Sequence, residues 1–448
     1  MSQRASIHTL GCRLNQADSA RLAAELRQGG FEVVPWGEAA DLLLVNSCAV
    51  TATAVQKTRQ ALRAARKRAP EAYVVLCGCA CTDEAFLRSC EKEGLADLAL
   101  PNPKPVRLLP LLPEKLRHGA DTPCVVSRRP WQPEGFRLEG VGDNPERTRA
   151  NLKIQEGCDF RCTYCIVPDA RGPAVSRDLD DVLREADELL RRGYRELVVT
   201  GVNVATYANG GCDLAGLLER LLALRPASEH GFRLRLSSTE PGPVLERVID
   251  LMKSDSRLCR FLHLPLQYGD DGILARMGRP YDTAQYAATV RRAAADVPGV
   301  CIGTDLMVGF PGEDEAAFRR CHDFLEELPL GLMHVFSYSP RPGTPAAAWK
   351  RPHGADVARR EAVLLTLAAA KAERFLETQF GREVEILPEG QGLCHGWSDN
   401  YIKVVCPDGT TARTGDGFLR CRLESLRDAS SREVCATIIR GEHDDETE

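Results

Sequence analysis

Short apolar runs alternate with helical stretches over most of this chain, and that alternation restricts the fold more than any other feature. From Ser6 to about Val126 it pairs Ile7–Leu10 with Ser19–Gln28, Leu42–Val45 with Val55–Arg68, and Tyr73–Leu76 with Asp83–Glu93. Such a rhythm is typical of βαβ units in an open parallel sheet. The first part of the chain is therefore predicted to be an α/β domain.

A second βα series runs from Thr148 to about Gln379. Its six candidate strands are Leu152–Gln155, Glu196–Thr200, Arg233–Ser237, Phe261–Leu266, Cys301–Val308 and Leu332–Ser337. The helices expected between and after them include Asp178–Arg192, Leu214–Leu224, Glu313–Leu328 and Asp356–Thr378. Six such units predict a partial (β/α)6 barrel, whose functional loops follow the carboxyl ends of the strands.

The end of the chain changes character. Short β-like runs at Glu383–Leu387, Ile402–Cys406 and Glu433–Ile439 are separated by Gly, Asp and Pro, which indicates a small β-barrel. A chain of 448 residues also exceeds what one hydrophobic core usually supports. We expect an N-terminal domain over 1–127, a Pro- and Gly-rich linker over 128–147, a core domain over 148–378, a β-barrel over 379–441 and an acidic tail over 442–448.

Composition limits the environment in which the protein works. The net charge of −5 gives no global signal for nucleic acid, so any RNA contact must come from local patches. The first ten residues lack the pattern of a secretory signal, and no apolar run approaches the length of a membrane span. We expect a cytoplasmic protein, in which clustered members of the 18 cysteines are better interpreted as metal ligands than as disulfides.

Cys158, Cys162 and Cys165 form a C-x3-C-x2-C run just after the first strand of the core domain. Three thiolates on a compact loop can hold three irons of a four-iron cluster and leave the fourth open for S-adenosylmethionine (SAM). A structural zinc site is the main alternative, but zinc takes four ligands, and no fourth Cys or His lies nearby in the sequence. With Tyr164 before the third cysteine, the run resembles the loop of the radical SAM superfamily.

Several polar and glycine-rich motifs lie at or just past the core strand ends. Glycines there let the backbone approach a ligand, and the polar groups suit the ribose, amine and carboxylate of SAM. Taken singly, each motif is equally well explained as an ordinary βα turn. The candidate SAM contacts are Tyr164, Gly201, Asn203, Ser238, Glu240, Gln267, Asp305 and Gly309.

A second cysteine trio comes from positions far apart in the sequence. Cys12, Cys48 and Cys79 each follow one of the first three predicted strands, and parallel strand ends share one edge of a sheet. We interpret them as ligands of a second, auxiliary cluster, again with one open iron. Cys77 and Cys81 flank Cys79 at a period of two, so either remains an alternative third ligand if the strand continues.

Together, the two trios and the terminal β-barrel resemble the methylthiotransferase family of radical SAM enzymes over nearly the whole chain. The runs Thr9-Leu-Gly-Cys-Arg-Leu-Asn-Gln16 and Asn46-Ser-Cys-Ala-Val-Thr51 are most similar to the branch that acts on threonylcarbamoyl-adenosine 37 of tRNA. The resemblance implies two [4Fe-4S] clusters, SAM, and a C-terminal TRAM domain that binds the RNA. Ser47 stands where that family usually has Thr, and Cys81 stands near a position usually taken by Gln.

The resemblance implies that one SAM methylates a sulfide at the auxiliary site and that a second SAM yields a radical that activates C2 of the adenosine. Acid–base catalysis cannot activate such an inert C–H bond, which explains why a radical cofactor is needed. Alternatives are the same chemistry on isopentenyl-adenosine 37 or on an aspartate of a ribosomal protein. A non-catalytic iron–sulfur RNA-binding sensor is a further alternative, which a reductant-dependent SAM cleavage assay would distinguish.

RNA contact is expected on the β-barrel, where basic side chains would meet phosphates and aromatic rings would stack on bases. A basic helix from Lys57 to Arg68 is a second candidate surface, although a solvated charged face explains it equally well. We expect a monomer that receives electrons from a flavodoxin or ferredoxin. The candidate RNA contacts are Arg382, Lys403, Arg413, Arg420, Arg422 and Tyr401, with Trp397 and Phe418 as further rings.

Overall fold

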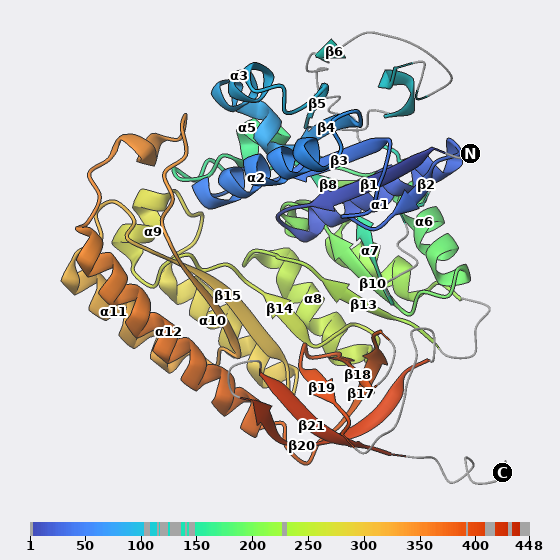
Figure 1. The fold of residues 1–448 in the computed structure, drawn as a ribbon. Coiled ribbons are helices and arrows are strands. Elements are labelled where there is room, and N and C mark those ends of the chain that lie inside the picture. The colour runs from blue at the N-terminus through green and yellow to red at the C-terminus, as the bar shows by residue number, and fades with distance from the viewer. Residues whose placement is uncertain are drawn as a thin grey trace, which may run out of the picture.

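The computed structural model describes residues 3–102, 108–113, 116, 124–125, 136–138, 141–142, 148–225, 231–390, 393–407, 417–428 and 432–439. Three layers of structure follow one another along the chain, with an N-terminal sheet above a central half-barrel and a small closed barrel below (Figure 1). Among these residues, no helix has both the length and the apolar character needed to cross a bilayer.

The N-terminal domain is a six-stranded parallel sheet in the order β2-β1-β3-β4-β5-β6. Its strands are β1 (Arg4–Thr9), β2 (Glu32–Val34), β3 (Leu42–Ser47), β4 (Tyr73–Gly78), β5 (Leu98–Pro101) and β6 (Cys124–Val125). Its helices are α1 (Arg13–Gln28), α2 (Ala52–Arg68) and α3 (Glu84–Lys92), with short 3-10 turns η1 (Cys79–Thr82) and η2 (Leu109–Leu111). The sheet is apolar on both faces, since every residue of β3 is buried.

The central domain places six parallel strands in two sheets of three. One has the order β13-β10-β7 and the other β14-β15-β16, and the isolated bridge Ser238–His263 joins them. The strands are β7 (Arg149–Lys153), β10 (Glu196–Thr200), β13 (Arg233–Leu236), β14 (Phe261–His263), β15 (Cys301–Val308) and β16 (Leu332–Ser337). The expected partial barrel is confirmed, and its buried side chains form the largest apolar cluster described in the chain.

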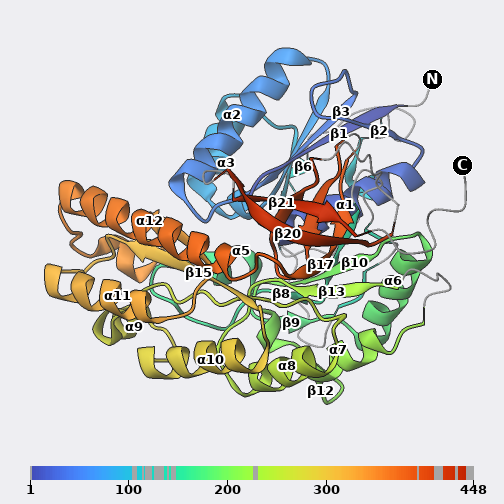
Figure 2. The ribbon, with the colours of Figure 1, turned by 90° about the horizontal axis from the view of Figure 1, so that it is seen from below.

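Helices cover the outside of this half-barrel (Figures 1 and 2). They are α6 (Leu179–Arg191), α7 (Leu214–Leu222), α8 (Pro243–Ser254), α9 (Asp271–Met277), α10 (Thr283–Asp296), α11 (Glu315–Glu327) and α12 (Gly354–Glu377). The short helix α5 (Val167–Arg171) instead packs against η1 of the N-terminal domain. Short elements between them are β8 (Gln155–Glu156), β9 (Val175–Ser176), η3 (Val204–Thr206), β11 (Ala208–Asn209), β12 (Cys212–Asp213) and η4 (Pro345–Ala348).

The C-terminal domain is a closed barrel in the order β17-β18-β19-β21-β20. Its strands are β17 (Glu383–Pro388), β18 (His395–Ser398), β19 (Lys403–Val405), β20 (Leu419–Asp428) and β21 (Glu433–Ile438). The closed barrel confirms the predicted third architecture. The predicted boundaries at 127, 147 and 378 stay predictions, and both the acidic tail and most of the 128–147 linker lie outside the described residues.

Buried arginines near the N-terminal ends of the core strands form hydrogen bonds with the small barrel. Arg235 donates to the backbone carbonyls of Ser398 and Asp399, each at 2.9 Å, and Arg233 donates to that of Trp397 at 2.8 Å. Both guanidiniums also pair with the fully buried carboxylate of Glu196 at 2.7 Å. Because the loop after β18 is thereby held under the half-barrel, Tyr401 on that loop reaches the central cavity.

Candidate active site: two cysteine trios beside one cavity

Cys12, Cys48 and Cys79 all line a single cavity of about 630 Å³. They follow β1, β3 and β4, which are neighbours in the sheet, so the shared strand edge brings together residues up to 67 positions apart. Burial raises the pKa of the Cys48 thiol to about 11 and also raises that of Cys79. Such thiols stay protonated at neutral pH unless a bound metal cation displaces the proton.

Two glycines allow this approach. Gly11 has φ +95°, and a Cβ there would lie 2.7 Å from Cβ of Cys48. Gly78 has φ +97°, and a Cβ there would lie 2.5 Å from the carbonyl oxygen of Ser47. Both positions require glycine, because a side chain would need a left-handed backbone and would displace the neighbouring cysteine loop.

The structure separates Cys79 from its two neighbours. The strand ends at Gly78 and Cys79 opens a 3-10 turn, so the continued strand that would align Cys77, Cys79 and Cys81 does not form. Cys77 packs in one apolar cluster under the sheet, and the Cys81 thiol donates to the carbonyl of Leu76 at 3.5 Å. Cys79 instead lines the cavity, and its sulfur accepts from the Asn102 amide at 3.4 Å.

Cys158, Cys162 and Cys165 lie on the loop between β8 and α5. Burial raises the pKa of Cys158, and that of Cys165 to about 12, and the neighbouring cysteines add to both shifts. The Arg279 guanidinium donates to the Cys162 sulfur at 3.4 Å and also pairs with Glu240. Three neighbouring thiols therefore lie beside a buried cation.

The spacing of the sulfur atoms bears on which metal group fits. A tetrahedral zinc site with Zn–S bonds of about 2.3 Å would hold its sulfurs about 3.8 Å apart. Among the described residues, only His263, Asp305 and His334 bring three potential ligand atoms within 4.8 Å, and neither cysteine trio does. Wider spacing suits a four-iron cluster, whose ligands bind different iron atoms.

A buried ionic network connects the two trios. Arg171, at the end of the helix that follows Cys165, donates to Glu156 at 2.6 Å, to Asp18 of the N-terminal domain at 3.3 Å, and also to Asn15. Lys153 donates to Asp18 at 2.7 Å. Burial opposes the charge of Arg171, but Cys79 and these carboxylates hold its pKa above the usual value. The network fixes α1 and α5 against each other.

The strand-end motifs carry buried polar atoms that have no hydrogen-bond partner. Among the described residues these include Asn203 Nδ2, Ser237 Oγ, Thr239 Oγ1 and Gln267 Oε1. Gln267 also has φ +72°, which is unusual for a residue with a side chain. Buried polar atoms are normally satisfied, so this set of unsatisfied groups fits the polar edges of a bound SAM molecule.

The other candidate SAM residues are distributed around the same strand ends. Gly201, Ser238 and Asp305 line the cavity. Burial raises the pKa of the Glu240 carboxyl, although Arg279 beside it acts in the opposite direction. Tyr164 is partly buried beside Arg279, and Gly309 donates its backbone N–H to Glu313 at 2.5 Å.

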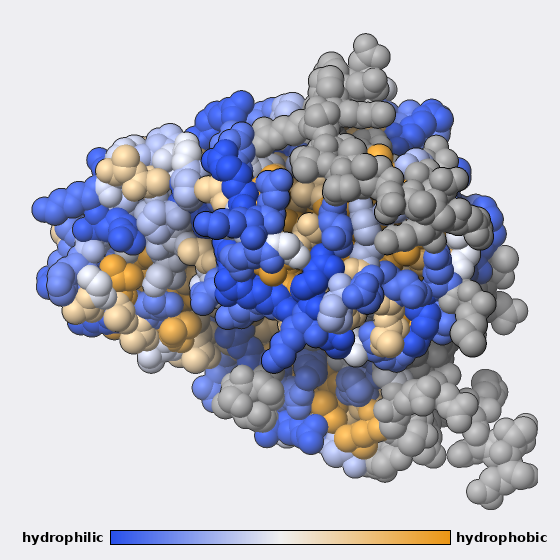
Figure 3. All heavy atoms as spheres, turned by 45° about the horizontal axis from the view of Figure 1, so that its top comes forward, coloured by the Kyte–Doolittle hydropathy of each residue, from blue (hydrophilic) through white to orange (hydrophobic). Residues whose placement is uncertain are grey.

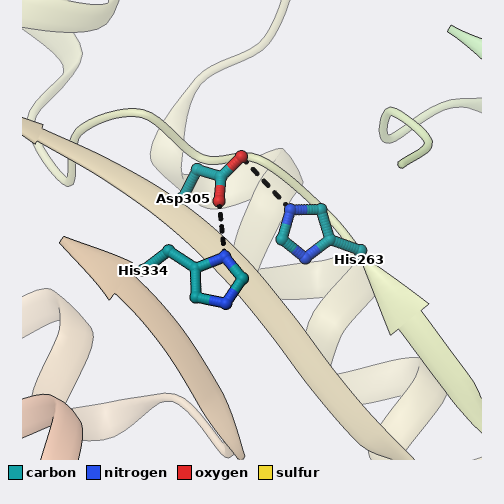
Figure 4. A group of neighbouring side chains, drawn as sticks. All are labelled: His263, Asp305 and His334. Carbon is teal, nitrogen blue, oxygen red and sulfur yellow. Dashed lines mark hydrogen bonds and ion pairs between the residues drawn. The ribbon is translucent and has the colours of Figure 1, made fainter. Parts of the chain in front are cut away.

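A His–Asp–His group also lines the cavity (Figure 4). The Asp305 carboxylate lies 3.2 Å from Nε2 of His263 and 3.2 Å from Nδ1 of His334, one ring at each oxygen. Burial raises the pKa of Asp305, but the two imidazoles outweigh it and hold that pKa well below its usual value. The carboxylate is therefore charged at neutral pH and engaged on both oxygens.

Sequence reasoning missed several residues of this site. His263 and His334 interrupt apolar strands, which is a signal that a half-polar cavity wall follows. Arg279 and Arg171 carried no such signal, because each is one arginine among many on a loop or short helix.

The predicted RNA contacts on the barrel are mostly paired. Lys403 pairs with Glu433, while Arg420 and Arg422 pair with Glu383 at 2.7 and 3.2 Å. Arg382 lines a separate cavity beside α12, and Arg413 lies outside the described residues.

Aromatic side chains stack on one another under the half-barrel. The Tyr401 ring lies 4.4 Å from that of Phe261 and 4.7 Å from that of Trp397, and the Phe418 ring lies under Arg233. These rings, which the sequence suggested for stacking on bases, thus form contacts between the half-barrel and the small barrel.

The basic face of α2 is neutralised in part. Arg59 and Arg63 both pair with Glu93 at 2.7 Å, and Arg66 pairs with Asp97 at 2.8 Å.

Comparison with known proteins agrees with this geometry. Residues 152–325 match the Radical SAM superfamily, and residues 4–98 match the Uncharacterized protein family UPF0004. The chain is 32% identical to the threonylcarbamoyladenosine tRNA methylthiotransferase MtaB of Thermotoga maritima, over 97% of this chain and 98% of that protein. It is 34% identical to the tRNA-2-methylthio-N(6)-dimethylallyladenosine synthase of Thermus thermophilus, over 89% of this chain and 84% of that protein.

Solved structures show the same fold at low identity. The radical S-adenosylmethionine methyltransferase TsrM of Kitasatospora setae matches with a TM-score of 0.51 at 18% identity, covering 77% of this chain and 75% of that one. From the fold, the two sequence matches and the full-length relatives, it follows that this chain is a member of the methylthiotransferase family of radical SAM enzymes.

Proposed function

We propose that this protein methylthiolates C2 of N6-threonylcarbamoyladenosine at position 37 of tRNA, converting t6A to ms2t6A. The observation that carries the choice of substrate is the shared cavity, which is lined both by Cys12, Cys48 and Cys79 and by His263, Asp305 and His334. A polar wall suits the carbamoyl, hydroxyl and carboxylate groups of a threonylcarbamoyl substituent. A purely hydrocarbon substituent such as dimethylallyl would offer these polar groups no hydrogen-bond partner.

Both trios are proposed to hold [4Fe-4S] clusters, Cys158, Cys162 and Cys165 the SAM-cleaving one and Cys12, Cys48 and Cys79 the auxiliary one. With SAM bound, an iron–sulfur cluster of this kind supplies a 5′-deoxyadenosyl radical that can activate an inert C–H bond. The strand-end groups Asn203 and Gln267 orient SAM with their buried, unpartnered polar atoms. The Arg171 network holds the two cysteine sites at a fixed separation, so substrate between them is close to both.

The remaining expectations belong to the same proposal. Electrons come from a small donor such as a flavodoxin or ferredoxin, the enzyme acts as a monomer, and it works in the cytoplasm. The exposed basic residues Arg420 and Arg422 contact tRNA phosphates. On binding, each exchanges its ion pair with Glu383 for an ion pair with a phosphate of the tRNA backbone. On the face drawn in Figure 3, hydrophilic side chains predominate and hydrophobic ones form small separate patches.

Nucleoside analysis by mass spectrometry tests this proposal. Bulk tRNA is compared from a strain with the gene, a deletion strain, and the deletion strain complemented with wild-type or Cys158→Ala protein. We expect ms2t6A to disappear on deletion, to return with the wild-type gene only, and t6A to accumulate in its place. Loss of 2-methylthio-dimethylallyladenosine, or of the modified ribosomal-protein aspartate, with ms2t6A unchanged would contradict the proposal.

A further inference from the structure

Arg13 is a cation of the central cavity that forms no ion pair with any described carboxylate. It is the first residue of α1, directly after Cys12, and it lines the same cavity as the three cysteines and the His–Asp–His group. Its guanidinium donates to the Tyr401 hydroxyl at 3.0 Å, and its central carbon lies 5.5 Å from the centre of that ring. Within the described part of the chain, no carboxylate lies within 4.0 Å of it, unlike the paired Lys153 and Arg171 nearby.

Tyr401 is held in place for this contact. Its φ of +65° is a left-handed conformation that is strained for a residue with a side chain, and such strain persists only where the surrounding structure imposes it. Phe261 of the half-barrel and Trp397 of the small barrel stack on its ring. The phenol therefore presents a fixed oxygen to Arg13, which orients the guanidinium across a domain boundary.

Among the described residues that line this cavity, no available anion faces Arg13. The one carboxylate in that lining, of Asp305, is already engaged by a histidine ring at each oxygen. The guanidinium thus faces a cavity of about 630 Å³ with donor groups to spare. An arginine fork matches a carboxylate particularly well, because two parallel N–H bonds meet its two oxygens.

We propose that Arg13, oriented by Tyr401, binds the carboxylate of the threonyl group on N6 of the target adenosine and so selects threonylcarbamoyl over hydrocarbon substituents. This inference rests on the proposed function, because it assigns a residue to that substrate. The carboxylate is the charged group by which the two substituents differ, and Arg13 is placed beside the cysteine site where the adenosine must lie.

Binding to anticodon stem-loop oligonucleotides tests the assignment. The reconstituted holoprotein is titrated at fixed salt with loops that carry t6A, the methyl ester of t6A, or N6-dimethylallyladenosine at position 37. The ester removes the charge and keeps the shape. We expect wild-type protein to bind the t6A loop about tenfold or more tightly than the ester, which is the usual size of a charge-assisted contact.

Four variants distinguish a loss of carboxylate recognition from a structural disturbance of the cluster site. Arg13→Gln should bring the ratio of the two affinities close to one, Arg13→Lys should keep part of it, and Tyr401→Phe should reduce it by a smaller factor. Arg27→Gln, an exposed change at the other end of the same helix, should keep the wild-type ratio. Iron content per chain is measured for each, because Arg13 adjoins Cys12.

A wild-type ratio in Arg13→Gln with unchanged iron content would overturn the assignment. If that variant loses iron, an unchanged ratio in both Arg13→Lys and Tyr401→Phe would overturn it equally. Failure of the proposed function looks different, since wild-type protein would then methylthiolate the dimethylallyl loop and leave the t6A loop unreacted.

Discussion

At the scale of single residues, burial decides how the cysteines of both trios behave. The thiols of Cys48 and Cys165 have pKa values raised to about 11 and 12. A buried thiol is a poor free nucleophile, but it becomes a good ligand once a metal replaces its proton. Both trios are therefore better suited to ligation than to covalent catalysis.

Removing one cysteine of a trio should remove the cluster at that site and the reaction step that depends on it. After anaerobic reconstitution, Cys158→Ala protein should hold about four iron atoms per chain instead of about eight. It should release no 5′-deoxyadenosine with SAM and a reductant. Cys12→Ala should also hold about four iron atoms but still release deoxyadenosine. Full product formation by Cys158→Ala would contradict the assignment.

Gly11 should be needed for the auxiliary site in particular. A Cβ at Gly11 would meet Cys48, whereas a Cβ at Gly210, which also has a positive φ, would meet nothing within 4 Å. We expect Gly11→Ala to lose about half of the bound iron while Gly210→Ala keeps all of it, both being measured by iron and sulfide analysis. Equal iron in the two variants would show that the close approach of Gly11 to Cys48 is unimportant.

At the scale of elements, the two ends of the core strands have different roles. The loops after their carboxyl ends form the candidate site, and side chains near their amino ends bind the small barrel. Glu196 at the start of β10 is fully buried between Arg233 and Arg235 of β13. Burial raises its pKa, but these two guanidiniums outweigh that effect and hold the pKa well below its usual value. The group is therefore a buried ion pair whose two arginines also bind the barrel backbone.

Glu196→Gln should lower the free energy of unfolding by about 3–5 kcal/mol near neutral pH, because it leaves buried guanidiniums unpaired. A carboxyl with a lowered folded pKa stabilises the protein above its unfolded pKa of about 4.5, and that stabilisation is lost as the pH falls below it. The difference between the two proteins in urea should thus be constant above about pH 5.5 and shrink under more acidic conditions. A difference that grows on acidification would contradict this.

The sequence predicted the elements well where the pattern was strong. Glu196–Thr200, Cys301–Val308 and Leu332–Ser337 form strands with the expected bounds. The strands β2 and β18 were missed because a strand of three or four residues shows too little periodicity. The start of the long β20 was missed because the sequence before it is rich in Gly, Asp and Thr and shows no strand pattern.

The site was predictable only in part. Cysteines at equivalent strand ends indicate a shared edge, whereas the cavity wall of His263 and His334 depends on how two sheets meet. Tyr401 reaches the cavity through a docking contact between domains, which no local pattern encodes.

At the scale of the whole molecule, the three domains meet around one cavity. Arg13 belongs to the first, Asp305 to the second and Tyr401 to the third, and all three line it. A molecule placed there is contacted by every domain, because the C-terminal barrel contributes Tyr401 to the cavity wall.

Charge on that barrel should tune tRNA binding. Replacing both Arg420 and Arg422 with Gln should weaken binding and reduce the slope of log K against log salt by about one for each phosphate that is no longer neutralised. Glu383→Gln, which frees the same two arginines, should strengthen binding. Filter-binding titrations over a salt series measure both, and unchanged slopes would show that tRNA lies elsewhere.

We propose that two cluster sites in one chain join a methylthio group to threonylcarbamoyladenosine. The most direct test of this proposal is a reaction of reconstituted protein with SAM, a reductant and anticodon stem-loops that carry either t6A or dimethylallyladenosine, followed by mass spectrometry of the nucleosides. We expect ms2t6A from the first loop together with 5′-deoxyadenosine and S-adenosylhomocysteine, and little product from the second. Methylthiolation of the dimethylallyl loop alone, or deoxyadenosine without any methylthiolated nucleoside, would contradict it.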